Sequence, residues 1–158
     1  MTLAERLLPK LSEWRPAGVG RHSWSETDAE AGWTVRVAAD RADSLSCLVW
    51  ELALARSGDA PAGLALAKWA EAIVARVGGL LEDLKVYEVD NTRNQAILRS
   101  DVPSARGDAL AYYEIQLYGL SRAVVRRFTK SKSGGHRSQV AFALTHEVLA
   151  GLAGDIAG

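Results

Sequence analysis

The chain has 158 residues, of which 48% are apolar and 24% charged, and these proportions are typical of a globular domain rather than a disordered or membrane-spanning one. A domain of about 150 residues buries roughly 70% of its unfolded surface, so one hydrophobic core is expected. The formal net charge is zero, with 13 basic and 17 acidic side chains in residues 1–120 and 6 and 2 in residues 121–158, a polarity well short of the basic footprint of nucleic-acid-binding domains.

The N-terminal segment has the apolar spacing of an amphipathic helix, formed by Leu3, Leu7, Leu8, Leu11 and Trp14. Pro9 is expected to kink this helix or to restrict it to two turns. Three strands are expected next, over residues 22–27, 33–39 and 46–56. The last of them has the Leu and Ala content of a helix, but the short polar link before it is typical of a hairpin connection.

A second helix is predicted over residues 62–81, with Asp59 as its cap and two glycines at its end. Its apolar stripe consists of Leu66, Trp69, Ile73, Val77 and Leu80. Residues 84–90 and 95–99 alternate on either side of the turn-forming pair Asp90–Asn91, which predicts a hairpin.

Two further strands are expected around a three-residue loop formed by residues 118–120. This loop places like with like across the hairpin: Tyr113 opposite Val125, Ile115 opposite Ala123, Tyr112 opposite Arg126 and Gln116 opposite Arg122. A two-residue loop would instead place both arginines on the apolar face, which the core should not accept.

A glycine-containing loop over residues 130–137 leads into the last predicted helix, for which Ser138 is the expected cap. The apolar face of this helix would contain Val140, Leu144, Val148, Leu152 and Ile156. The order helix, three strands, helix, four strands, helix predicts a single α+β domain over residues 1–158, in which helices pack an antiparallel sheet.

This order of elements resembles the type III secretion chaperone-like fold, and the resemblance covers most of the chain. It departs from that fold by an additional strand over residues 121–129 and by the absence of a strongly acidic character. The resemblance implies a small protein that binds another chain on its sheet or helix surface, often as a homodimer, without catalytic residues.

Cys47 is the only cysteine and lies in an apolar run, so an internal disulfide and a thiol cluster for zinc are excluded and a buried thiol is expected. Charged residues interrupt both the first fourteen residues and the longest apolar stretch, residues 63–81. We therefore expect a cytoplasmic protein without a membrane partner. The weak charge polarity makes nucleic acid the less favoured partner.

No histidine has the sequence context of a metal or catalytic site. His146 and Glu147 lack the second histidine of HExxH because position 150 is alanine, so a structural, partly exposed His146 is expected. His22 and His136 lie in turns without a nucleophile or carboxylate at motif spacing. A hydrolase remains an alternative in which the site is assembled from distant segments. No metal or cofactor is expected.

The favoured function is a non-enzymatic, chaperone-like module that binds a protein partner through aromatic and arginine side chains of one sheet face. Tyr112, Tyr118, Arg122 and Arg126 are the expected contact residues. Trp14 is expected to contribute too, because the N-terminal helix could dock or exchange between the subunits of a homodimer. Trp24 is a further interface candidate, whereas Trp33, Trp50 and Trp69 are expected in the core.

The alternative is an anion or nucleic-acid binder that uses the loop over residues 130–137. Its glycines could expose backbone amides just before a helix N-terminus, with cations beside them. The residues of this candidate site are Lys130, Lys132, Gly134, Gly135 and Arg137. Arg122, Arg126 and Arg127 of the preceding strand would add further cations to it.

Overall fold

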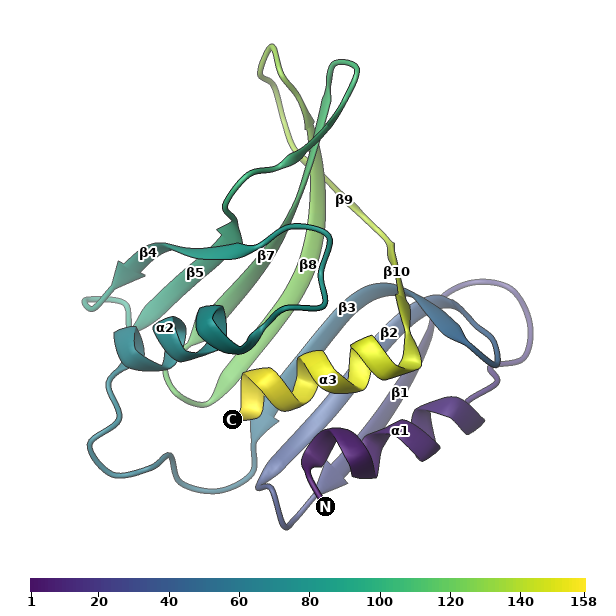
Figure 1. The fold of residues 1–158 in the computed structure, drawn as a ribbon, viewed down its shortest axis with the longest axis vertical. Helices are drawn as coiled ribbons and strands as arrows, with labels where there is room; N and C mark the ends of the chain where they lie inside the picture. The colour runs from purple at the N-terminus through teal and green to yellow at the C-terminus, as the bar shows by residue number, and fades with distance from the viewer.

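The computed structural model describes residues 1–158 as three helices and ten strands (Figure 1). The helices are α1 (Leu3–Glu13), α2 (Leu66–Arg76) and α3 (His146–Ala157). The strands are β1 (His22–Asp28), β2 (Trp33–Ala42), β3 (Ser46–Arg56), β4 (Leu84–Asp90), β5 (Gln95–Ser100), β6 (Ser104–Arg106), β7 (Ala109–Tyr118), β8 (Arg122–Ser131), β9 (Ser138–Val140) and β10 (Phe142–Thr145). The α+β class and the initial order of helix, three strands and helix are confirmed, but seven strands rather than four follow α2.

All ten strands belong to one antiparallel sheet with the order β1-β2-β3-β8-β7-β5-β4, and the short strands β10, β6 and β9 pair with β3, β7 and β8. The three helices lie on the same side of this sheet (Figure 1). β3 and β8 are neighbours at its centre, where Leu52 lies opposite Val125. This pairing joins the first three strands to the strands that follow α2, so one hydrophobic core extends across the whole sheet.

An aromatic pair connects the sheet to two of the helices. Trp33 of β2 is 2% exposed and stacks on Trp69 of α2, with 5.9 Å between the ring centroids. The indole Nε1 of Trp69 donates a hydrogen bond to the carbonyl of Ile156 in α3 (3.1 Å). Full burial of such side chains contributes about 1.5–3 kcal/mol each, so this pair is a main anchor of the helical layer.

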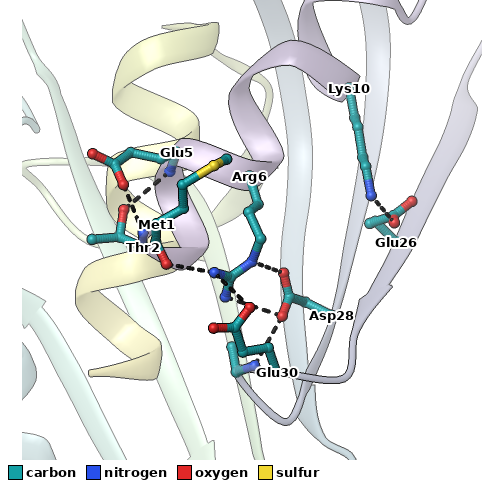
Figure 2. A network of polar contacts seen from close by, with 9 residues as sticks. Met1, Thr2, Glu5, Arg6, Lys10, Glu26, Asp28 and Glu30 are labelled. Carbon is teal, nitrogen blue, oxygen red and sulfur yellow. Dashed lines mark hydrogen bonds and ion pairs between the residues drawn. The ribbon is translucent and has the colours of Figure 1, made fainter.

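Ion pairs hold α1 against β1 of the same chain (Figure 2). Arg6 Nε donates to Asp28 Oδ2 at 2.5 Å, and Lys10 pairs with Glu26 one turn later. Thr2 and Glu5 form a capping box at the start of the helix. Pro9 lies inside α1, which continues to Glu13, so the restriction to two turns is wrong; the ion pairs and the buried leucines on either side hold the helix through the proline.

The second helix is shorter at both ends than the sequence pattern predicts. It begins after Ala65, which makes no side-chain capping bond, so Asp59 is not its cap. Gly63 adopts a φ of +76°, and Leu64 N donates to Pro61 O in a turn, so the chain is not helical before residue 65. Val77 ends the helix with an extended backbone.

The last helix begins at His146, so the predicted start near Ser138 is wrong. Thr145 is the cap, and its hydroxyl accepts a hydrogen bond from Val148 N (3.1 Å). Ser138 lies in β9, and Phe142 lies in β10, opposite Val49 of β3. The apolar side chains at residues 140, 142 and 144 fit the period of a helix as well as that of a strand. They belong to strands because residues 46–49 of β3, which β8 leaves unpaired, pair with β10.

The β7–β8 hairpin has the predicted faces and the predicted loop length, but its register differs from the predicted one by two residues. Its loop is residues 119–121, so Tyr118 lies opposite Arg122 and Tyr113 opposite Arg127. Gly119 has a φ of +54° and donates its N–H to Asn94 O (2.7 Å). Because Tyr118 also pairs with β5, it belongs to the strand rather than to the loop.

Candidate functional site

The side of the sheet away from the helices, here called the open face, carries four of the residues predicted to bind a partner. Tyr112 and Tyr118 come from β7, and Arg122 and Arg126 from β8. The strand register places them on one face because Tyr113, Ile115 and Leu117 point into the core. The Arg122 guanidinium lies 4.3 Å from the Tyr118 ring centroid. Two adjacent strands thus bring these four residues together.

Trp14, the fifth predicted contact residue, is not part of the open face. It ends α1 on the helix side of the sheet, where it is half-buried against the core. Trp24 of β1 is also half-buried there. Neither side chain is therefore brought near the tyrosines and arginines of the open face.

Glu114 organises one half of the open face, and its role was missed in the sequence. Its carboxylate is 5% exposed and accepts hydrogen bonds from Arg99 Nε (2.9 Å) and Arg137 Nη1 (2.6 Å). Arg137 also lies over the Phe128 ring and donates to the hydroxyl of Tyr112 (3.4 Å). Tyr112 is consequently 6% exposed and forms part of a closed network rather than a free contact surface.

The other half of the open face contains a groove of about 450 Å³. Small side chains line much of it, namely those of Ser25, Ala38, Ala53 and Ala55, together with Val124. Trp50, Arg36 and Arg122 also line it, as does Glu51, which is paired with Arg126 (Nε–Oε2 3.0 Å).

Trp50 lies on the open face, so its predicted core position is wrong. The β2–β3 register shifts between residues 38 and 39, and the shift pairs Ala38 with Glu51 but Ala39 with Val49. This irregularity turns Val49 and Leu52 inward and Trp50 outward. The Arg21 guanidinium then lies over the half-buried indole of Trp50, 3.8 Å from the ring centroid.

The loop over residues 130–137 lacks the geometry expected of an anion site. It leads into β9 rather than into a helix, so no helix N-terminus stands behind Gly134 and Gly135. Arg137 is engaged by Glu114, and Lys132 N donates to Asp108 O (2.7 Å). Lys130 and Lys132 form no ion pair.

Arg127, a cation of the nucleic-acid alternative, is buried on the helix side of the sheet. It binds Glu82 with both Nη groups at 2.8 and 3.0 Å, and its guanidinium lies 4.1 Å from the Tyr113 ring centroid. Burial alone would raise the pKa of Glu82, but hydrogen bonds from Arg127, Ser104 and Ser100 outweigh it and lower that pKa below its usual value. This network stabilises the fold and cannot reach a ligand.

His146 is 3% exposed, so its predicted partial exposure is wrong. Its Nε2 lies 2.6 Å from Asp43 O and its Nδ1 3.7 Å from the thiol of Cys47, because the start of α3 packs against the β2–β3 turn. Burial raises the pKa of Cys47 to about 11, so we expect little thiolate and a slow reaction of this thiol. No group of three potential metal-binding side chains is present, and the Nε2 of His22 is buried without a hydrogen-bond partner.

No family model matches the chain, and no curated protein or solved structure was found to resemble it. The similarity to the type III secretion chaperone-like fold is therefore based on the order of elements alone. None of the three helices has the length and apolarity needed to cross a membrane.

Proposed function

We propose that this protein is a non-enzymatic protein-binding module that holds an acidic segment of its partner in the groove of the open face. The proposal is carried by the balance of charge around the groove. Arg36 and Arg122 line it without a carboxylate partner, whereas Glu51 is neutralised by Arg126. The groove therefore presents two free cations and no free anion.

The shape of the groove supports the same function. The small side chains that line the groove allow another backbone to approach the sheet closely, and Trp50 provides aromatic area of the kind enriched at interfaces. All three helices cover the opposite face, so the groove is not blocked by the chain itself (Figure 1). A chaperone-like role and a cytoplasmic location belong to the same proposal, as does a homodimer if the partner is a second copy.

The test compares two double variants that change the charge equally. Arg36→Glu with Arg122→Glu reverses the groove, and Arg15→Glu with Arg106→Glu reverses two exposed, unpaired arginines elsewhere. Tagged proteins are used to capture partners from native lysate, followed by mass spectrometry and by measurement of the purified pair. One protein should bind the wild type and the control stoichiometrically, and the groove variant about tenfold or more weakly. Equal binding by both double variants would refute the groove assignment.

Salt dependence and nucleic-acid absorbance of the captured material separate the alternatives. Nucleic acid bound through several phosphates is lost steeply as salt rises, whereas an acidic segment held by Arg36 and Arg122 should weaken less steeply, because fewer charges are paired. Light scattering of the purified protein shows whether the captured partner is a second copy.

A further inference from the structure

Arg56 differs from every other arginine that is withdrawn from solvent. Five arginine side chains are buried or half-buried, namely Arg6, Arg56, Arg99, Arg126 and Arg127. Four of them hold a carboxylate within ion-pair distance, from Asp28, Glu114, Glu51 and Glu82. Arg56 holds none. A cation removed from water without a counterion is costly, and an anion bound beside it would offset that cost.

The guanidinium of Arg56 is fixed in place by its surroundings. Its Nε donates to Leu120 O at 2.9 Å, and its carbon lies 4.3 Å from the ring centroid of Trp33 and 5.9 Å from that of Trp69. Burial is the cause that lowers the pKa of Arg56. The two Nη groups, which form the fork of the guanidinium, have no hydrogen-bond partner in the chain, so they are free for a ligand.

These free donors border a cavity of about 670 Å³ at the end of β3. Leu64, Leu120 and Tyr118 supply apolar wall, and the loop at residues 58–60 supplies backbone N–H groups that form no hydrogen bond within the chain. Two ionised side chains besides Arg56 line the cavity, Arg93 and Asp59. Asp59 would repel a second negative charge on a ligand, so a monoanion suits the cavity better than a dianion.

We propose that Arg56 anchors a binding site for a carboxylate attached to a short apolar group. A planar carboxylate matches two parallel N–H donors of a guanidinium, and the fixed position of Arg56 reduces the entropy lost on binding. The apolar group would lie against Leu64 and Leu120. The carboxylate can come from a small organic acid or from the C-terminus of a peptide. This site is separate from the groove of the open face and does not depend on it.

The test titrates hexanoate into the ¹⁵N-labelled protein at constant ionic strength, with hexan-1-ol as the uncharged counterpart. The Nε–H signal of Arg56 and the amide signals of residues 58–60 and 119–121 should shift in a saturable way with hexanoate and not with the alcohol. Arg56→Gln should weaken binding about tenfold or more, since a charge-assisted bond is lost. Arg93→Gln, in the same cavity but exposed, should weaken it less than about threefold.

Shifts that never saturate, or equal affinity in Arg56→Gln and the wild type, would overturn the proposal. If Arg56→Gln does not fold, the shift of the Arg56 Nε–H signal in the wild type still tests whether hexanoate binds there. Arg56→Lys then replaces the glutamine variant, because it keeps the charge but lacks the two Nη donors. N-acetylleucine identifies the source: tighter binding than hexanoate supports a peptide C-terminus, and weaker binding supports a small organic acid. Tighter binding of inorganic phosphate than of either carboxylate would refute the assignment to a carboxylate.

Discussion

Replacement of Arg127 by methionine should destabilise the protein far more than the same replacement of its neighbour Arg126. The side chains of Arg127 and Glu82 are 8% and 4% exposed, and the pair is joined by two hydrogen bonds. Removing one partner of a buried ion pair leaves the other charge buried and uncompensated, at a cost of about 3–5 kcal/mol. Arg126 and Glu51 are 28% and 32% exposed, and breaking such a pair costs about 0–1 kcal/mol.

Urea unfolding followed by tryptophan fluorescence measures both variants. A domain of this kind has a total stability of about 5–15 kcal/mol, so Arg127→Met should remain folded without urea but with a much lower midpoint. The slope of the free energy of unfolding against urea should stay constant. If Arg127→Met costs no more than Arg126→Met, the buried pair is not the anchor inferred from the structure.

The pH dependence of stability gives a second, independent test of the Arg127–Glu82 pair. In the wild type the pKa of Glu82 is lowered, so its contribution is present above the unfolded value of about 4.3 and is lost as pH falls through the folded pKa. Without Arg127, only the bonds from Ser104 and Ser100 oppose the effect of burial, so the pKa of Glu82 should be higher than in the wild type and less stability should be lost as pH falls. The stability difference between wild type and Arg127→Met should therefore shrink from pH 7 to pH 4. A difference that is independent of pH would contradict this reasoning.

Three further predictions concern other parts of the fold. Arg6→Ala should lower the free energy of unfolding by about 1–3 kcal/mol, because it breaks the bond to Asp28 that fastens α1 to β1. Gly119→Ala should cost about 1–2 kcal/mol in the same assay, since φ is +54° and the added Cβ would meet Asn94 Nδ2 at 2.8 Å. The thiol of Cys47 should not react with a disulfide reagent at pH 8 until urea unfolds the chain, because burial raises its pKa to about 11.

Each of these has a matched control. Lys10→Ala removes the exposed neighbour of the Arg6 pair and should cost less than about 1 kcal/mol. Gly107→Ala has a φ of +59° but open space for a Cβ, so it should cost less than Gly119→Ala. If Lys10→Ala or Gly107→Ala costs as much stability as Arg6→Ala or Gly119→Ala, the assigned contacts are not the cause of the loss. If Cys47 reacts in the folded protein as fast as in urea, burial does not protect its thiol.

Much of the fold could be predicted because apolar alternation is local information. The predicted faces of β7 and β8, with Tyr113, Ile115, Ala123 and Val125 turned inward, agree with the core. The failures share one cause, which is that a distant partner decides between two local options. Residues 138–144 could be strand or helix until β3 and β8 offered open edges. Alternation predicts the wrong face for Trp50, because it cannot reveal the register shift between β2 and β3.

The candidate sites were harder to predict because the availability of a charge depends on which charges lie nearby in space. In the sequence, Arg122, Arg126, Arg127 and Arg137 are equivalent cations of one basic segment. In the fold, the last three are bound by Glu51, Glu82 and Glu114, and Arg122 remains free beside a groove. Arg56 shows no sequence signal at all, because its lack of a counterion becomes visible only when every neighbouring carboxylate has been placed. Cations without a carboxylate partner are therefore the feature that connects both proposed sites, and only the tertiary structure could distinguish them from paired ones.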